Sequence, residues 1–274
     1  APRACGRIIA RRRPDVVLGG GGYVAGPMVL AAALRRIPTA LTEADAQFGL
    51  ANRLAAPFAR RVFLSFPIPG REGPKYVVTG RPIPAGSRAV ERTEARRRFD
   101  LPAEGQVVLV FGGSQGARTL NELALDAWAE RGPAVLHLSG DWHYEELRGR
   151  ISRPDYKLLP FTREFGAALG AADLVVARAG GSIWEIAAAG KPAVLVPFPF
   201  ATSDHQTANA RYFGEAVELV ADADAARVVP GLVEELLGDP GRLARMAAEM
   251  RARARPGAAD EVAEGVLELV AARG

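Results

Sequence analysis

The stretch Val107-Val108-Leu109-Val110-Phe111-Gly112-Gly113-Ser114-Gln115-Gly116-Ala117 decides which fold we expect for this chain. It opens with five apolar residues, the pattern of a strand that is buried on both faces of a parallel sheet. A glycine-rich turn follows directly, and a helical stretch at 118–130 begins after it. A strand, a glycine turn and a helix in this order predict one strand-to-helix unit of an α/β fold.

Similar apolar runs, separated by helical stretches, recur on both sides of this unit. They lie at 16–18, 39–41, 62–64, 134–138, 174–177 and 193–196, and helical stretches at 224–238, 240–253 and 258–273 end the chain. Strands that alternate with helices indicate βαβ units and a parallel sheet. We therefore predict an α/β protein.

Prolines and glycines crowd the segment between Phe66 and Arg88, which we interpret as a linker. The length of 274 residues suits two domains. We expect an N-terminal domain at 1–78, which is too short for a complete doubly wound sheet, and a C-terminal domain at 79–257. The last segment, 258–274, is expected to form a helix that packs back on the N-terminal domain.

The composition is that of a globular protein, with 49% hydrophobic and 24% charged residues. No apolar run reaches the roughly 20 residues that cross a bilayer, and no secretion signal is expected from the first residues. The single cysteine, Cys5, excludes an internal disulfide and a thiolate metal cluster, and it suits a reducing cytoplasm. The net charge of +4 comes largely from arginine clusters at 11–13, 35–36, 60–61 and 96–98. These clusters indicate either solvated helix faces or attraction to anionic phosphates or lipids, and no nucleic-acid partner is expected.

Three glycine-rich turns each follow a predicted strand and precede a helix, at 19–23, 112–117 and 178–182. A helix N-terminus presents unpaired amides and a partial positive charge, so it can hold a phosphate group without a lysine. The second and third turns lie in one domain at the carboxyl ends of parallel strands, where both would face one crevice, and a diphosphate suits this pair. Neither turn matches the Walker loop or the Gly-x-Gly-x-x-Gly dinucleotide fingerprint. Each turn alone is also explained as a tight strand-to-helix connection.

Polar residues near the third turn have two interpretations each. Glu185, three residues after Ser182, could accept both hydroxyls of a ribose, or could complete a capping box with Ser182 as N-cap. The segment 204–210 reads Asp-His-Gln-Thr-Ala-Asn-Ala, which suits sugar hydroxyls or a surface helix capped by Asp204. The triplet 222–224 reads Asp-Ala-Asp, and we interpret it as a helix cap rather than as a metal-binding Asp-x-Asp motif. No second ligand has helical spacing to His205, so we expect no metal site there.

Four segments together resemble the MurG family of peptidoglycan glycosyltransferases: 20–27, 112–121, 178–192 and 204–210. The similarity runs over essentially the whole chain. It implies the GT-B architecture, two Rossmann-like domains with parallel sheets, the first of which we expect to be incomplete. It also implies an inverting transfer of N-acetylglucosamine from UDP-N-acetylglucosamine (UDP-GlcNAc) to undecaprenyl-diphospho-muramoyl-pentapeptide, which converts lipid I to lipid II. Family members need no cofactor and no metal in the donor site, and they act at the anionic cytoplasmic face of the cell membrane.

The resemblance also assigns site residues. The donor-binding set would be Gly113, Ser114, Gln115, Gly116, Gly181 and Ser182 at the diphosphate, Glu185 at the ribose, Phe161 and Thr162 at the uracil, His205, Gln206 and Asn209 near the sugar, and Arg178. The acceptor diphosphate would be faced by Gly20, Gly21, Gly22 and Tyr23. Arginines such as Arg35, Arg36, Arg60 and Arg61 would help the N-terminal domain meet the membrane.

The chain departs from the family pattern in three places. We expect it to lack the first strand and the Gly-Gly-Thr-Gly-Gly-His loop, which carries a candidate general base in the family. The family's His-Glu-x-Asn segment reads Thr42-Glu43-Ala44-Asp45 in this chain, and Asp45 becomes the candidate base. The family's Gly-Asn-Pro-Val-Arg hinge is replaced by residues 80–84, and Arg81 or Arg88 is the candidate substitute for the hinge arginine. Two alternatives therefore stay open. One is a chain that binds the donor without turnover, and the other is a different GT-B enzyme, such as a nucleotide-sugar 2-epimerase or a transferase to a small acceptor.

Overall fold

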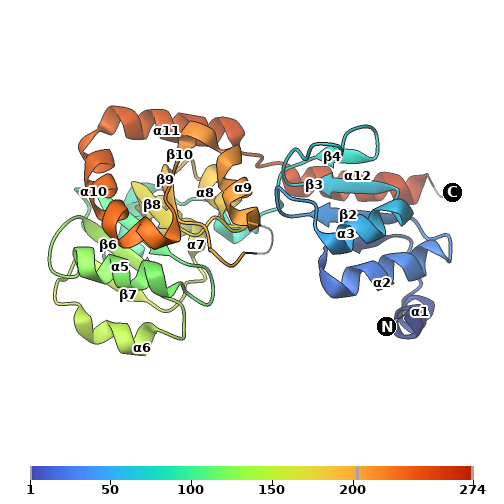
Figure 1. The fold of residues 1–274 in the computed structure, drawn as a ribbon, viewed down its shortest axis with the longest axis horizontal. Coiled ribbons are helices and arrows are strands. Elements are labelled where there is room, and N and C mark those ends of the chain that lie inside the picture. Colours follow the sequence, from blue (N-terminus) through green and yellow to red (C-terminus); the bar gives the residue numbers. More distant parts are fainter. Residues whose placement is uncertain (1, 202–203, 273–274) are drawn as a thin grey trace. The chain divides into compact units, whose positions relative to one another are not determined.

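The computed structural model describes residues 2–201 and 204–272, which form two compact units (Figure 1). Unit 1 comprises Ala1–Ile83 and Arg255–Gly274, and unit 2 comprises Pro84–Ala254. The chain therefore passes from unit 1 to unit 2 at 83/84 and returns to unit 1 at 254/255. The boundaries expected from the sequence are 78/79 and 257/258.

Unit 1 is built on a four-stranded parallel sheet with the order β1-β2-β3-β4. Its strands are β1 (Val17–Gly19), β2 (Thr39–Glu43), β3 (Arg61–Leu64) and β4 (Tyr76–Val78). Its helices are α1 (Pro2–Arg12), α2 (Gly22–Ala33), α3 (Leu50–Ala55) and α12 (Ala258–Ala271), with the 3-10 turn η1 (Ala56–Phe58) after α3. The sequence does not predict β4, because three half-buried residues within a proline- and glycine-rich segment carry no strand pattern.

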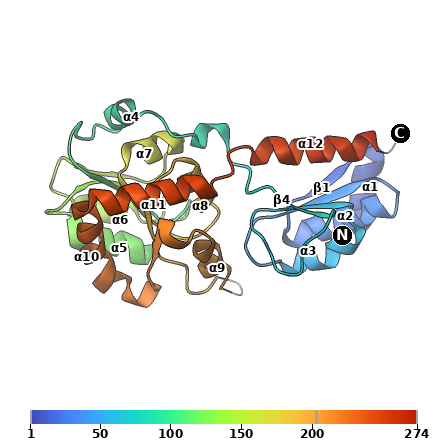
Figure 2. The same cartoon turned by 90° about the horizontal axis from the view of Figure 1, so that it is seen from above.

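The last helix, α12, packs on the sheet of unit 1 (Figure 2). Val262 and Leu269 share a buried apolar cluster with Phe63 of β3. Arg61, also on β3, forms an ion pair with Glu268 at 2.6 Å. The chain thus ends on the unit in which it starts, although the whole of unit 2 intervenes in the sequence.

Unit 2 is built on a six-stranded parallel sheet with the order β10-β9-β8-β5-β6-β7. Its strands are β5 (Val107–Phe111), β6 (Ala134–Leu138), β7 (Tyr156–Leu159), β8 (Leu174–Ala177), β9 (Ala193–Leu195) and β10 (Val217–Leu219). Its α-helices are α4 (Arg92–Arg98), α5 (Arg118–Trp128), α6 (Tyr144–Leu147), α7 (Phe165–Ala171), α8 (Ile183–Ala188), α9 (His205–Tyr212), α10 (Ala225–Gly238) and α11 (Pro240–Arg253). The described residues of unit 2 also form the 3-10 turns η2 (Ala85–Ser87), η3 (Arg148–Arg150), η5 (Gly214–Ala216) and η6 (Asp222–Asp224).

The burial of the strands explains which of them the sequence predicts. Every residue of β5, β6 and β8 is buried, since α5 and α7 both pack against β5 and helices cover both faces of the sheet (Figure 2). The sequence does not predict β7 and β10, the two edge strands. Each is short and includes a charged residue, Lys157 or Glu218, because an edge strand is only partly covered.

The strand order fixes where a ligand site is expected in unit 2. From β5 the chain winds outward to β7, and from β8 it winds outward in the opposite direction to β10. In doubly wound sheets, ligands bind where the winding reverses, beyond the carboxyl ends of the strands. Here this point lies between β5 and β8, which are paired up to Phe111 and Ala177. The glycine turns at 112–117 and 178–182 therefore leave adjacent strands side by side.

Candidate functional site

The turn after β5 has a backbone conformation that requires glycine. Gly116 has a φ of 78°, and a Cβ at this position would lie 2.0 Å from the carbonyl oxygen of Ser139, just after β6. The turns after β5 and β6 therefore pack backbone against backbone. Ala117, the N-cap of α5, supplies no side-chain hydrogen bond, so the first amides of α5 remain available to an anion at this edge of the sheet. Ser114 and Gln115 in the same turn are exposed.

The turn after β8 differs from the expected free helix terminus. The amides of residues 183–185 donate to the carbonyls of residues 180–182, so the first amides of α8 are used within the turn. The amides of Gly181 and Ser182 donate to no backbone carbonyl among the described residues. The groups that this turn offers to a ligand are thus the amides before the helix, not those of its first turn.

Glu185 is not part of a capping box, and that interpretation is wrong. Ser182 occupies the N-cap position with right-handed helical angles and makes no side-chain cap. The Glu185 carboxylate instead accepts a hydrogen bond from the hydroxyl of Ser87, the last residue of η2. Ser87 is buried and Glu185 is half-buried. Ser87 gave no signal in the sequence, because it lies in the segment that we interpreted as a linker.

Arg178 joins the ends of two strands. Its Nη1 donates to the carbonyls of Val196 and Pro197 at 3.0 and 3.1 Å and pairs with Asp222 at 2.5 Å. This side chain therefore holds the segment after β9 against the end of β8, and its assignment to donor binding remains a prediction. The capping interpretation of the 222–224 triplet is also wrong, because Asp224 occupies the N-cap position of α10 without a side-chain cap.

Helix α9 is fastened to these turns by two of its three candidate residues. The Gln206 Oε1 accepts a hydrogen bond from the amide of Phe198 at 2.9 Å. The buried Asn209 donates from Nδ2 to the carbonyl of Ala179 at 3.3 Å. His205 is half-buried at the start of the helix. Asp204 precedes the helix at the N-cap position but makes no side-chain cap, so its expected capping role is wrong.

Phe161 and Thr162 follow β7, at the same edge of the sheet but two strands away from β5. Phe161 is 54% exposed, which is unusual for a large apolar side chain and leaves its ring available for stacking. The Thr162 hydroxyl accepts a hydrogen bond from the amide of Glu164 at 3.0 Å.

A buried polar network links α5, which follows the turn after β5, to residues in and after β6. Asn121 of α5 donates from Nδ2 to the carbonyl of Ser139 at 2.9 Å, and its Oδ1 lies 2.9 Å from Nε2 of His137. The Oδ1 of Asn121 is an acceptor, so Nε2 of His137 carries the proton, and Nδ1 accepts from the Tyr156 hydroxyl at 2.8 Å. Burial lowers the pKa of His137 to about 3, so the ring is neutral. The network fixes α5 to the carbonyl against which Gly116 packs.

In unit 1, the glycine turn after β1 lies beside the end of β2 and the start of α3. A Cβ on Gly21 would lie 3.7 Å from Nδ2 of Asn52, which donates to the Glu43 carboxylate at 2.9 Å. Glu43 also accepts from the amides of Ala44, Asp45 and Gly49, so this buried carboxylate shapes the loop that contains Asp45. The Oδ1 of Asn52 is buried and has no hydrogen-bond partner within residues 2–201 and 204–272.

The other predicted acceptor residues lie in the same turn. Gly20 precedes α2, Gly21 is its N-cap, and Gly22 and Tyr23 begin it. The side chain of Tyr23 lies outside the described part of the structure. Neither Glu43 nor Asn52 was predicted as a site residue, although Glu43 falls in a segment that the family pattern covers.

Among residues 2–201 and 204–272, no three His, Cys, Asp or Glu side chains gather as a metal-binding cluster. In the same part of the chain, no helix combines the length and the apolar character needed to span a bilayer.

Comparison with known proteins agrees with this geometry. Residues 107–262 match the glycosyltransferase family 28 C-terminal domain, and residues 2–64 match the N-terminal domain of that family. The UDP-N-acetylglucosamine–N-acetylmuramyl-(pentapeptide) pyrophosphoryl-undecaprenol N-acetylglucosamine transferase of Halorhodospira halophila is 44% identical over 276 residues, which cover 96% of this chain and 75% of that protein. The chain belongs to the MurG family. It is a glycosyltransferase of the hexosyltransferase class.

Other similar proteins agree with this family membership of the chain. The transferase of the same description from Rubrobacter xylanophilus is 41% identical and is 80% covered. The crystal structure of Acinetobacter baumannii MurG superposes with a TM-score of 0.78 at 28% identity, over 98% of this chain and 77% of that one. A UDP-GlcNAc 2-epimerase from Neisseria meningitidis has a TM-score of 0.67 at 15% identity, which shows a shared GT-B fold and no more.

Proposed function

We propose that this chain transfers N-acetylglucosamine from UDP-GlcNAc to undecaprenyl-diphospho-muramoyl-pentapeptide, a step of peptidoglycan synthesis. One observation in the structure carries the proposal: the turns 112–117 and 178–182 leave the paired strands β5 and β8 at the point where the sheet reverses its winding. Membership of the MurG family supplies the substrate class.

The donor would lie across these two turns. The amides at the start of α5 and those of Gly181 and Ser182 would bind the diphosphate. Glu185, beside the third turn, would accept the hydroxyls of the ribose, and the exposed ring of Phe161 with Thr162 would lie at the uracil. Gln206, Asn209 and His205 would line the sugar side of the site.

The reaction needs a base and a stabilised leaving group. An acceptor hydroxyl attacks C1 of the sugar, the bond from C1 to the diphosphate oxygen breaks, and UDP leaves with the electron pair. The amides of the two turns would stabilise the charge that develops on the diphosphate, and attack from the opposite face gives the β linkage. Asp45, in the segment that replaces the family's His-Glu-x-Asn, is the candidate that would take the proton. The neighbouring Glu43 carboxylate accepts hydrogen bonds from its own loop and from Asn52 of α3.

The acceptor side of unit 1 would meet an anionic, cytoplasmic membrane surface. Leu50, Leu54 and Phe58 are 69%, 68% and 48% exposed and follow one another at four-residue spacing along α3 and η1. The exposed Arg53 and Arg60 lie in the same segment. Exposed apolar residues bordered by arginines favour a lipid surface. Arg61 is less suited than its neighbours, because it is paired with Glu268.

Charge reversal tests this membrane contact. The double variant Arg53→Glu with Arg60→Glu should pellet less with vesicles that contain anionic lipid, while Arg227→Glu, an exposed arginine of unit 2, should pellet like the unchanged protein. Equal sedimentation of all three proteins would remove the proposed surface.

Calorimetric titration with UDP-GlcNAc tests the donor site. Glu185→Ala should weaken binding by about tenfold or more, as expected when a charged acceptor of two hydroxyls is lost. Glu145→Ala, at an exposed position of α6, serves as the control and should bind normally. Unchanged binding by Glu185→Ala would refute the assignment of the ribose.

Product analysis with labelled UDP-GlcNAc and the lipid acceptor separates the remaining alternatives. Transfer to the lipid supports the proposal. A labelled 2-epimer without transfer would indicate an epimerase, and donor binding with neither product would indicate a chain without turnover.

A further inference from the structure

We propose that Ser87 is a positioning residue, which holds the Glu185 carboxylate in the orientation that receives the ribose hydroxyls of the donor. This inference rests on the proposed function of Glu185. It assigns a role to a residue that lies 98 positions away in the sequence, before the first strand of unit 2.

The contact between the two side chains is direct and sheltered. The Ser87 hydroxyl donates to Oε1 of Glu185, and Ser87 is only 5% exposed. This is the one hydrogen bond of the Glu185 carboxylate to the described residues. A carboxylate offers about four lone-pair positions, so a single serine leaves room for two further donors. The arrangement therefore orients the carboxylate without consuming its capacity to bind a diol.

The 3-10 turn η2, which ends in Ser87, is itself held in place by backbone contacts. The amide of Ser87 donates to the carbonyl of Pro84 at 2.9 Å, which closes the 3-10 turn η2. Helix α7 presses on this turn through Gly166, where a Cβ would lie 2.0 Å from the carbonyl oxygen of Arg88 and 2.8 Å from that of Gly86. The amide of Val90 donates to the carbonyl of Gly166 at 3.2 Å. The backbone that carries Ser87 is thus fixed against α7 of unit 2.

Serine suits this task for chemical reasons. Glutamate has three side-chain torsions, and their freedom is lost when the carboxylate binds a ligand in one orientation. A hydrogen bond that fixes the orientation beforehand reduces this loss. Because serine carries no charge, it leaves the negative charge of Glu185 available to the ribose hydroxyls, whereas an arginine or lysine would neutralise it.

Calorimetry with two nucleotides tests the inference. UDP has the ribose hydroxyls and 2′,3′-dideoxy-UDP lacks both, so the ratio of their affinities measures what the hydroxyls contribute. Ser87→Ala should weaken UDP binding by about five- to tenfold and leave the dideoxy nucleotide within about twofold, as expected for lost preorganisation. Ser152→Ala, an exposed serine of the same unit, is the matched control and should leave both affinities unchanged.

The double variant Ser87→Ala with Glu185→Ala completes the cycle. If Ser87 acts through Glu185, its removal has no further effect once Glu185 is absent. A ratio that Ser87→Ala leaves unchanged, while Glu185→Ala reduces it, would overturn the role of Ser87 alone. A ratio that Glu185→Ala also leaves unchanged would overturn the ribose assignment on which the inference rests. Tryptophan fluorescence of each variant verifies that unit 2 is folded.

Discussion

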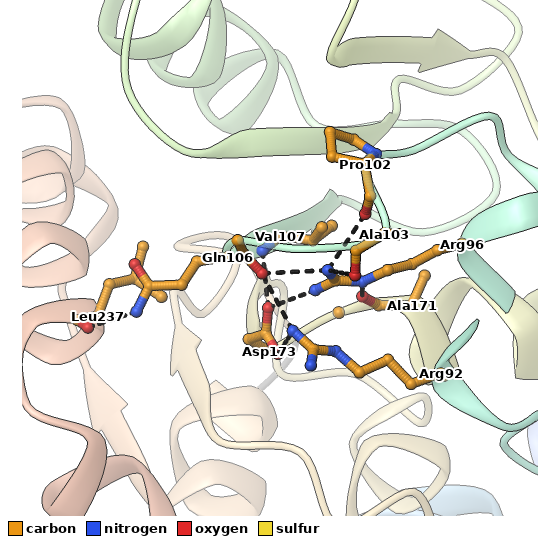
Figure 3. Close-up of polar contacts among 12 residues, drawn as sticks. Arg92, Arg96, Pro102, Ala103, Gln106, Val107, Ala171, Asp173 and Leu237 are labelled. Atoms are coloured by element: carbon orange, nitrogen blue, oxygen red, sulfur yellow. Dashed lines mark hydrogen bonds and ion pairs between the residues drawn. The ribbon is translucent and has the colours of Figure 1, made fainter.

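Replacing Arg96 by methionine tests the network that closes the amino-terminal edge of the sheet in unit 2 (Figure 3). Arg96 lies in α4, and its side chain is 1% exposed. Its guanidinium donates to the carbonyl of Ala171, the last residue of α7, at 3.2 Å, and to the carbonyls of the loop residues Pro102, Ala103 and Gly105 at 3.2, 2.9 and 3.0 Å. It also pairs with Asp173 at 2.7 Å, and Asp173 accepts from the amide of Val107 at 2.8 Å. The network therefore connects α4 to the segments that precede β5 and β8.

The expected cost follows from these contacts. Burial lowers the pKa of Arg96 and the Asp173 carboxylate opposes the shift, and a guanidinium remains charged in any case. Removing one partner of a buried ion pair costs about 3–5 kcal/mol. Asp173 is 22% exposed and keeps both Val107 and Arg92, the latter at 3.3 Å, so the lower end applies. We expect Arg96→Met to lower the free energy of unfolding of unit 2 by about 3 kcal/mol.

Tryptophan fluorescence during urea unfolding measures this loss in the right unit. The three tryptophans of the chain, Trp128, Trp142 and Trp184, all lie in unit 2. Arg97→Met is the control, because Arg97 is 76% exposed and its pair with Glu94 contributes at most about 0.5 kcal/mol. Equal stability of the two variants, or a loss below about 1 kcal/mol for Arg96→Met, would refute the reasoning. Donor affinity should be retained, since the network lies at the edge of the sheet opposite to the site.

Three further predictions concern the two units separately. Burial lowers the pKa of His137 to about 3 from 6.5, so between these pH values the unfolded chain binds more protons than the folded chain. The stability of unit 2 should therefore fall by about 3 kcal/mol from pH 7.5 to 4.5. Urea unfolding of His137→Gln should show a weaker pH dependence than that of the unchanged protein, and an equal pH dependence would contradict a buried, neutral His137. Gly116→Ala places a Cβ 2.0 Å from the Ser139 carbonyl oxygen at a positive φ. The variant should lower the free energy of unfolding by about 2–4 kcal/mol in the same assay and weaken UDP binding. Wild-type behaviour in both measurements would refute the described turn. At Gly265 even a Cβ would lie 2.7 Å from the Phe63 ring, so Gly265→Leu should destabilise unit 1 by about 1–3 kcal/mol. Circular dichroism would detect this loss while the tryptophan signal of unit 2 stays unchanged. A shift of the tryptophan transition would contradict the packing of α12 on unit 1.

Much of the fold could be predicted from the sequence because buried strands carry their own signal. The central strands β5, β6 and β8 are covered on both faces, so their residues must be apolar and their positions are visible as unbroken runs. Glycine turns after such strands are equally visible, because a tight approach of two backbones excludes any side chain. The short strands β4, β7 and β10 were not predicted, since partial exposure permits polar residues and removes the pattern.

The site was predicted less completely, because its partners come from distant parts of the chain. The cap interpretations at Ser182, Asp204 and the 222–224 triplet relied on local spacing, and the N-cap residues Ser182, Asp204 and Asp224 all lack the predicted side-chain cap. Asp222 binds Arg178, which follows another strand, and Glu185 binds Ser87, which lies 98 positions earlier in the sequence. A local pattern gives no information about such partners.

The sequence by itself determined the α/β class, the three glycine turns and the family, since these depend on residue types that local geometry and backbone packing require. Only the tertiary structure decided that β5 and β8 are paired neighbours, that the chain changes unit at 83/84 and 254/255, and that a serine before the first strand of unit 2 donates to the carboxylate of Glu185. The physical reason is the same in each case: strand order and side-chain partners are set by packing between segments far apart in the chain.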